Sequence, residues 1–313
     1  MYHSPVTKLL LSGLIIAGLL SSCIKNNLSS QPASPLQSIY ANISRSSGYS
    51  ILSAAIVKAG YDDSLNHGKG PYTLFAPSNA TFAFYGVGSA ADLNRISTDS
   101  VKKIIGYHLI TKYLPTDILP DGPDSAKTTL SGFPVYFTAG TQYIFINGNI
   151  ISPPSNYACT NGIIHLINGI LNPPTATIAP SLPNIRKLSL FNAAVIRANL
   201  TTTLSGTTLY TVFAPSDSAF AAAGYATVQA INSTDPAVLA KLVSYHIISG
   251  RLFSTDLVNA ATPQTLQGGK ITLSTGTAIT VLGASNKTAA TVTSLNITAS
   301  NGVIYIINQL LTP

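Results

Sequence analysis

The stretch that decides the fold occurs twice. "YTLFAPS" runs from Tyr72 to Ser78, and "YTVFAPS" runs from Tyr210 to Ser216, 138 positions later. Each copy alternates apolar residues into Phe-Ala-Pro, which predicts a strand, and each ends on a serine placed to cap a following helix. Such a match can arise by chance, from a recurring local motif such as a strand followed by a capped helix, or from a duplicated domain. The spacing of the flanking segments distinguishes these origins.

The flanking segments repeat in the same order. "SILSAAIVKAGY" from Ser50 and "SLFNAAVIRANL" from Ser189 align without a gap, 139 positions apart. Both place apolar residues at the helical spacing i, i+3, i+4 and i+7. These residues are Leu52, Ala55, Ile56 and Ala59 in one segment and Phe191, Ala194, Val195 and Ala198 in the other. The sequence therefore predicts two matching amphipathic helices.

Further pairs extend the repeat to the end of the chain. Tyr107-His108 and Tyr245-His246 are 138 positions apart, and "NGIIHLINGIL" from Asn161 returns as "NGVIYIINQLL" from Asn301, 140 positions later. Spacings that drift by a few residues while the order is kept indicate duplication with insertions in loops. We define copy 1 as residues 37–173 and copy 2 as residues 181–313, joined by a short proline-rich linker, residues 174–180.

The order of patterns within each copy predicts an α+β fold. Helical periodicity fills the first half, and short β-branched runs fill the second, including "YIFINGNII" with its Asn147-Gly148 hairpin signal. A length of 313 residues accommodates two such domains. We expect a sheet core in each copy with helices gathered at one side.

The first 23 residues resemble an export signal and predict where in the cell the protein is located. Lys8 precedes an apolar run from Leu9 to Leu20, and "LSSC" ends at Cys23. This pattern resembles a bacterial lipoprotein signal, residues 1–22, which makes Cys23 the lipidated N-terminus and residues 23–36 a flexible tether. The alternative is an ordinary secretory signal with a coincidental cysteine. We expect a protein of the bacterial cell envelope, lipid-anchored to the outer membrane, with the membrane face left open.

The composition of the chain indicates which partners and crosslinks are not expected. The charged fraction is 9% and the net charge is +7, and the basic residues are scattered rather than interleaved with aromatic residues. This argues against nucleic acid as a partner. If Cys23 carries lipid, Cys159 is the only other cysteine, so no disulfide framework is expected.

The ordered set Phe-Ala-Pro-Ser, Tyr-His, Thr-Leu-x-Gly and a terminal Asn-Gly segment, present twice, resembles the fasciclin (FAS1) family of extracellular adhesion modules. The resemblance implies two FAS1-like domains, each a β-sandwich or wedge flanked by several short helices, and no enzymatic activity. It also maps the adhesion-linked Tyr-His pair of the family onto both copies. The mapped residues are Tyr107, His108, Tyr245 and His246. Two interpretations stay open for them: contact with a ligand, or packing at a helix end where the imidazole satisfies a backbone group.

Two departures from the family pattern bear on function. Asn156 and Asn296 stand where some animal members have an acidic residue implicated in integrin binding, so that recognition is not expected here. His165 of copy 1 is replaced by Tyr305 in copy 2, and a position that tolerates both residues indicates packing.

Neither an active site nor a metal site is predicted. Ser78, His108 and Asp117, mirrored by Ser216, His246 and Asp256, are the residue types of an acyl-transfer triad. The serines and aspartates stand where capping is their commonest role, and no G-x-S-x-G elbow is present. The histidines lack the spacing of metal ligands. We expect no catalytic residues, no metal and no cofactor.

The sequence thus favours a non-enzymatic, lipid-anchored envelope protein that mediates adhesion or matrix and surface interaction through tandem FAS1 domains. The alternative is an accessory glycan-binding lipoprotein of an outer-membrane polysaccharide uptake system. The expected partners are membrane lipid through acylated Cys23 and a protein or glycan ligand whose identity stays open.

Overall fold

The computed structural model describes residues 35–119, 125–140 and 142–313. The predicted signal peptide, Cys23 and most of the predicted tether lie outside the described residues. Among the residues described, no helix combines the length and the apolar character needed to cross a membrane.

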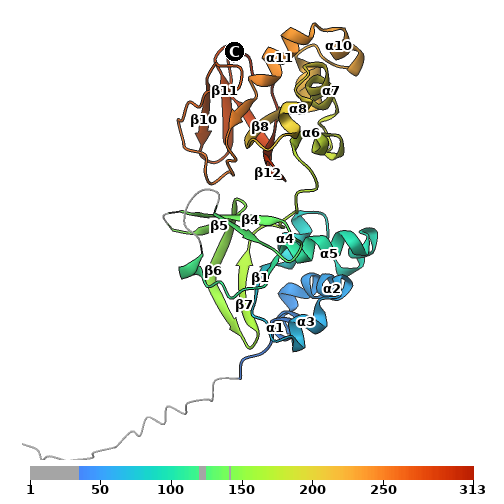
Figure 1. Cartoon of the computed structure of the whole chain (residues 1–313), viewed down its shortest axis with the longest axis vertical. Coiled ribbons are helices and arrows are strands. Elements are labelled where there is room, and N and C mark those ends of the chain that lie inside the picture. The colour runs from blue at the N-terminus through green and yellow to red at the C-terminus, as the bar shows by residue number, and fades with distance from the viewer. Residues whose placement is uncertain (1–34, 120–124, 141) are drawn as a thin grey trace, which may run out of the picture. The chain divides into compact units, whose positions relative to one another are not determined.

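Copy 1 consists of short helices packed along one side of a seven-stranded sheet (Figure 1). Its helices are α1 (Ile39–Arg45), α2 (Ser50–Ala59), α3 (Asp62–His67), α4 (Asn79–Phe84) and α5 (Thr98–Tyr107), with 3-10 turns η1 (Ser47–Tyr49), η2 (Ala90–Arg95) and η3 (Thr116–Ile118). Its strands are β1 (Tyr72–Pro77), β2 (Leu109–Ile110), β3 (Ser125–Thr128), β4 (Pro134–Ala139), β5 (Ile144–Ile146), β6 (Asn149–Cys159) and β7 (Gly162–Ile167). The order across the sheet is β2-β1-β7-β6-β5-β4-β3.

Copy 2 repeats this plan with a six-stranded sheet in the order β10-β11-β12-β13-β8-β9. Its helices are α6 (Ile178–Ser181), η4 (Leu182–Asn184), α7 (Ser189–Arg197), α8 (Thr201–Ser205), α9 (Asp217–Ala222), α10 (Val228–Ser233) and α11 (Pro236–Ser244). Its strands are β8 (Tyr210–Pro215), β9 (Ile247–Ser249), β10 (Ile271–Thr275), β11 (Ile279–Gly283), β12 (Ala290–Ala299) and β13 (Gly302–Ile307). The predicted α+β class is confirmed. Helix α6 starts at Ile178, inside the segment that the sequence indicates as a linker.

The repeated heptapeptides form the inner strands β1 and β8. In β1, Leu74 and Ala76 pack among the helices, whereas Phe75 belongs to a second apolar cluster inside the curl of the sheet. In β8, Phe213 is likewise separated from Val212 and Ala214. Both strands are therefore covered on two faces, which explains their almost continuous apolar sequence. Each pairs in parallel with the last strand of its own copy, β7 or β13.

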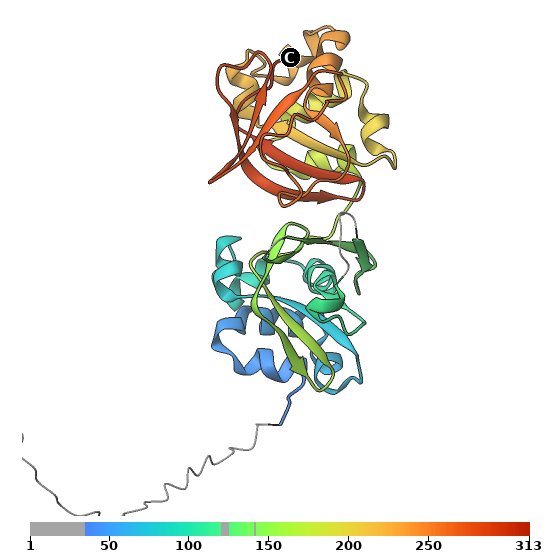
Figure 2. The same cartoon turned by 90° about the vertical axis from the view of Figure 1, so that its left-hand side faces the viewer.

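One long strand in each copy bends the sheet. In β6 the pairing with β7 breaks between Ser152 and Tyr157, and in β12 the pairing with β13 breaks between Ser294 and Ile297. Asn156 and Asn296 lie in these breaks with positive φ, 66° and 54°. Such bulges increase the local twist of a strand. The view of Figure 2, turned by 90°, shows that the strands of each copy are strongly curved.

Three local predictions are confirmed. The Ser78 hydroxyl accepts a hydrogen bond from the amide of Thr81 at 3.2 Å, and Ser216 does the same in copy 2 at the start of α9. Asn147 and Gly148 form the turn between β5 and β6, with φ of 48° and 73°. These features follow from short-range chemistry, because a hydroxyl caps a nearby amide and Asn-Gly accepts positive φ at little cost.

Candidate interaction site

The Tyr-His pair of copy 1 lies buried at the end of α5. His108 contacts two backbone groups: its Nδ1 lies 2.8 Å from the carbonyl oxygen of Ile104, and its Nε2 accepts a hydrogen bond from the amide of Leu171 at 3.0 Å. Because Nε2 accepts, Nδ1 carries the proton and the ring is neutral. Burial lowers the pKa of His108 to about 4, partly offset by the bond to Ile104.

Tyr107 joins the same helix end to the sheet. Its hydroxyl donates to the carbonyl of Pro134 at 2.8 Å and accepts from the side-chain amide of Asn147 at 3.0 Å. Burial raises the pKa of Tyr107 well above its ordinary value. The phenol therefore stays protonated and connects α5 to strand β4 and to the Asn-Gly hairpin.

Copy 2 builds the same arrangement. His246 contacts the carbonyl of Leu242 through Nδ1 at 2.8 Å and accepts from the amide of Leu311 at 2.9 Å. The hydroxyl of Tyr245 donates to the carbonyl of Lys270 at 2.6 Å. Burial again lowers the pKa of the histidine, His246, to about 4. This geometry corresponds to the packing interpretation of the Tyr-His pairs. A role of the four residues in adhesion stays a prediction, and such a role would be exerted through the stability of each domain.

The asparagines at the bulges hold the curl of each sheet. Asn156 accepts a hydrogen bond from the amide of Thr116 at 2.9 Å and donates to the Thr116 hydroxyl at 2.7 Å. In copy 2, Asn296 makes the same two contacts with Ser254, at 2.8 and 2.9 Å. Both amide groups are thus engaged within their own domain.

His165 and Tyr305 are interchangeable because both donate to the same backbone position. The Nε2 of His165 lies 2.7 Å from the carbonyl oxygen of Leu114, and the hydroxyl of Tyr305 donates to the carbonyl of Leu252 at 2.8 Å. Both rings also stack on the phenylalanine of the heptapeptide. This geometry explains why the position accepts either residue.

The residue types of the acyl-transfer triad are not assembled as one. Ser78 and Ser216 cap α4 and α9, and both ring nitrogens of each buried histidine contact backbone groups. Asp117 lies exposed in η3, and Asp256 accepts from the amide of Phe253 at 2.8 Å. Within residues 35–119, 125–140 and 142–313, no group of three or more His, Cys, Asp or Glu side chains could hold a metal ion.

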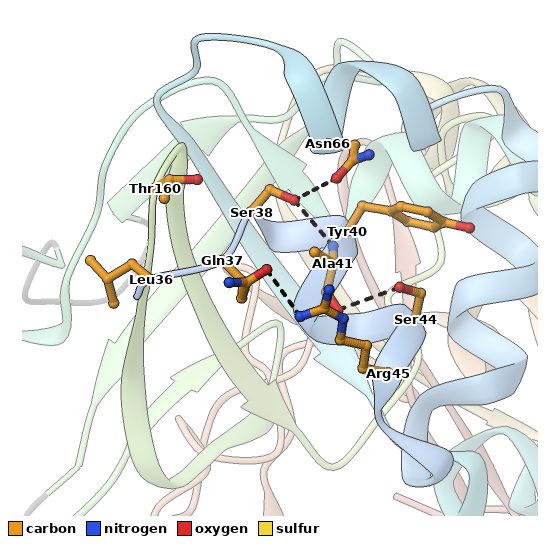
Figure 3. A pocket seen from close by; sticks show the side chains of 9 residues that line it. All are labelled: Leu36, Gln37, Ser38, Tyr40, Ala41, Ser44, Arg45, Asn66 and Thr160. Carbon is orange, nitrogen blue, oxygen red and sulfur yellow. Dashed lines mark hydrogen bonds between the residues drawn. The ribbon is translucent and has the colours of Figure 1, made fainter. Parts of the chain in front are cut away.

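A polar hollow of about 450 Å³ lies on copy 1 where the chain enters α1 (Figure 3). Its wall is formed by Leu36, Gln37, Ser38, Tyr40, Ala41, Ser44, Arg45, Asn66 and Thr160. The guanidinium of Arg45 donates to the side-chain oxygen of Gln37 at 3.0 Å, and the Ser38 hydroxyl donates to Asn66 at 2.7 Å. The hollow thus combines an aromatic ring, Tyr40, with fixed amide, hydroxyl and guanidinium groups.

Copy 2 lacks this set of groups. The amide of Thr160 donates to the carbonyl of Gln37, and the amide of Ser300 donates to that of Ala176, which fixes the correspondence between the copies. Alanine therefore replaces Gln37, and at the same spacing Ala179 replaces Tyr40 and Asn184 replaces Arg45. We did not predict the hollow from the sequence; the only signal for it is this difference between otherwise matching segments.

The duplication seen in the fold agrees with the comparison to known protein families. The sequence family model of the fasciclin domain matches this chain twice, over residues 47–173 and over residues 186–313. Two matches over most of the chain show that it belongs to the fasciclin domain family.

Two animal relatives are longer than this chain. Transforming growth factor-beta-induced protein ig-h3 of Sus scrofa is 27% identical over 252 residues, covering 79% of this chain and 35% of the relative. Human periostin is 28% identical over 253 residues, covering 79% of this chain and 29% of the relative. The chain therefore spans about a third of the length of these relatives. A solved FAS1 domain pair of the insect cell adhesion molecule Fasciclin I matches 88% of this chain and 96% of its own, at 16% identity and a TM-score of 0.42.

Proposed function

We propose that this chain is a non-enzymatic, lipid-anchored envelope protein that acts in adhesion through the exposed surfaces of its two fasciclin domains. The observation that carries the proposal is the pair of consecutive fasciclin matches, residues 47–173 and 186–313. The engagement of the candidate catalytic side chains in capping and packing supports the non-enzymatic part. The lipoprotein-like sequence ending at Cys23 supports the anchor.

The test compares bacteria that express the full chain with bacteria that express Cys23→Ser at the same level. We expect the wild type in the membrane fraction and Cys23→Ser in the soluble fraction, because multiple acyl chains at one cysteine bind a membrane stably. Attachment of the cells to surfaces coated with fibronectin, collagen or extracted polysaccharide should fall at least about fivefold in Cys23→Ser.

Protease treatment of intact cells separates the two parts of this proposal. Loss of the wild-type protein under protease agrees with adhesion at the cell surface. A membrane-bound protein that resists protease would retain the anchor and overturn cell adhesion. Equal membrane association of wild type and Cys23→Ser would overturn the anchor itself.

The polar hollow favours a second candidate, glycan binding. Sugars bind where an aromatic face adjoins several polar groups, and Tyr40, Gln37 and Arg45 provide this combination. Elsewhere, the exposed rings of Phe84 and Tyr85 meet edge to face at 80° and do not form a flat stacking platform. The hollow is therefore the better place for a sugar.

Tyr40→Ala tests this candidate, with Asn184→Ala, at the position in copy 2 that corresponds to Arg45, as the matched control. We expect Tyr40→Ala to weaken retention of the protein in polyacrylamide gels containing polysaccharide by about tenfold, and Asn184→Ala to leave retention unchanged. Equal retention of wild type and Tyr40→Ala would exclude the hollow as the sugar site.

A further inference from the structure

An apolar cavity of about 190 Å³ lies in copy 1 among α2, α4, η2 and α5. Its lining includes Phe82, Leu93, Val101 and Ile105 at the inner end, and Tyr85 and Asn172 supply its polar groups. None of the side chains that line it is charged. An interior of this kind excludes charged groups and accepts an uncharged apolar one.

The two copies differ at one position of this region in a way that explains the cavity. From Phe75 to His108, copy 1 aligns with copy 2 at a constant spacing of 138 positions, so that Val87 corresponds to Tyr225. The backbone makes the same hydrogen bond at both places. The amide of Val87 donates to the carbonyl of Phe82, and the amide of Tyr225 donates to that of Phe220, each at 3.0 Å. Valine and tyrosine therefore enter the domain from equivalent places.

In copy 2 the ring of Tyr225 is partly buried at this position. It packs against the helical core of its domain and meets the ring of Phe220 edge to face, with centroids 6.1 Å apart. Several other lining positions remain apolar and similar in size, for example Leu93 against Ile231 and Ile105 against Val243, whereas Ala223 replaces Tyr85 and Thr234 replaces Ile96. Copy 1 thus shares most of the apolar residues around this position but has the isopropyl group of Val87 where copy 2 has the ring of Tyr225.

Another aromatic residue of copy 1, Tyr85, lines the cavity, and Phe84 lies beside it on the surface. Tyr85 and Phe84 occupy the positions of Ala223 and Ala222. Tyr85 is 48% exposed, and Phe84 is 86% exposed. Tyr85 and Asn172 therefore offer a hydroxyl and an amide group to the polar part of a ligand.

We propose that the cavity of copy 1 binds a small, uncharged molecule with a single aromatic ring, of the phenol type, with the ring between Phe82 and Ile105 and its polar substituent at the mouth beside Tyr85 and Asn172. The occupant follows from copy 2, where a phenol ring, that of Tyr225, takes the corresponding place. An apolar cavity of about 150 Å³ in another protein accepts benzene, so the size also suits one ring. The proposal stands independently of adhesion.

The test uses the full chain and 4-methylphenol, which is the side chain of tyrosine as a free molecule. Calorimetric titration should give one site per chain, with a Kd on the order of 1 mM or below for so small a ligand. Val87→Tyr installs the ring of copy 2 and should weaken binding at least about tenfold. Tyr225→Val opens the corresponding space in copy 2 and should raise the stoichiometry from one to two.

Methyl NMR of the wild type provides a readout that needs no variant. Signals of Val101 and Ile105 should shift on addition of 4-methylphenol, whereas those of their counterparts Leu239 and Val243 should not. The proposal is wrong if the wild type shows no saturable shift, or if both copies shift alike.

Two other occupants are distinguished in the same experiment. Octanoate is added as a competitor of 4-methylphenol. If octanoate displaces 4-methylphenol and binds more tightly, the cavity is a site for acyl chains, and the proposal of an aromatic ligand is wrong. Self-association that excludes 4-methylphenol and disappears in Phe84→Ala would show that a second copy of the chain fills the cavity instead. Phe84→Ala should otherwise leave binding of 4-methylphenol unchanged within about twofold.

Discussion

Gly302→Ala is expected to lower the free energy of unfolding of copy 2 by more than about 4 kcal/mol. Gly302 opens β13 and lies opposite Tyr210 in the parallel pairing with β8. A Cβ atom at this position would overlap the carbonyl oxygen of Tyr210 and press against the side chain of Ile178. Because the obstacle is backbone in the middle of the sheet, no rotamer change relieves it, and the two strands must separate.

Urea unfolding of the variant measures this effect, with Gly276→Ala as the matched control. A Cβ at Gly276 meets no atom within 4 Å, so that substitution should change the free energy of unfolding by less than about 1 kcal/mol. Gly162→Ala in copy 1 should repeat the large loss, because its Cβ would meet the carbonyl of Tyr72 in the same way. If Gly302→Ala were as stable as Gly276→Ala, β8 and β13 could not approach as closely as the structure has them.

The parts of the fold that depend on neighbouring residues could be predicted from the sequence. The period of the apolar residues indicates the helices α2 and α7. Ser78 and Ser216 cap helices because a hydroxyl at the N-cap position lies within reach of the amide three residues later. The Asn147-Gly148 turn is equally local. Duplication made these predictions stronger, since each pattern had to hold at two places in the chain.

The features that depend on distant residues could not be predicted. Nothing near β1 indicates that it pairs in parallel with β7, about 90 residues later along the chain. The role of His165 was recognised as packing, but its partner, the carbonyl of Leu114, became visible only in the structure. The cavity beside Val87 has the same origin, because an empty space is a property of the residues around it. Only the contrast with Tyr225 marks it in the sequence.

Acid is expected to destabilise both copies between pH 6.5 and about 4, because each buries one neutral histidine at the end of a helix. Burial lowers the pKa of His108 and of His246 to about 4, below the value of about 6.5 that an unfolded chain shows. In this window the unfolded chain binds a proton that the folded chain does not. The stability that depends on the neutral ring is therefore fully present above pH 6.5 and is lost as the pH falls.

The expected loss is about 1.4 kcal/mol per pH unit for each histidine, and about 3 kcal/mol for each copy by pH 4. Copy 1 should lose more than copy 2, because burial also lowers the pKa of His165, whereas Tyr305 occupies that position in copy 2. Carboxylates take up protons below about pH 5, so the slope between pH 5 and pH 6.5 reports the histidines most directly.

His246→Gln and His108→Gln test the assignment, and each variant controls for the other. Glutamine can still accept from the amide of Leu311 or Leu171 but does not titrate. His246→Gln should therefore remove the pH slope of copy 2, and His108→Gln should reduce that of copy 1, where His165 still titrates, each at a cost of about 1–2 kcal/mol near pH 7.5. Hydrogen exchange in urea, followed by mass spectrometry, reads the two copies separately. In His246→Gln, copy 2 should become insensitive to pH between 5 and 6.5 while copy 1 keeps its slope. If both copies kept their slopes in both variants, the protons would enter elsewhere, and the buried Tyr-His pairs would not be the groups that make the folded chain acid-sensitive.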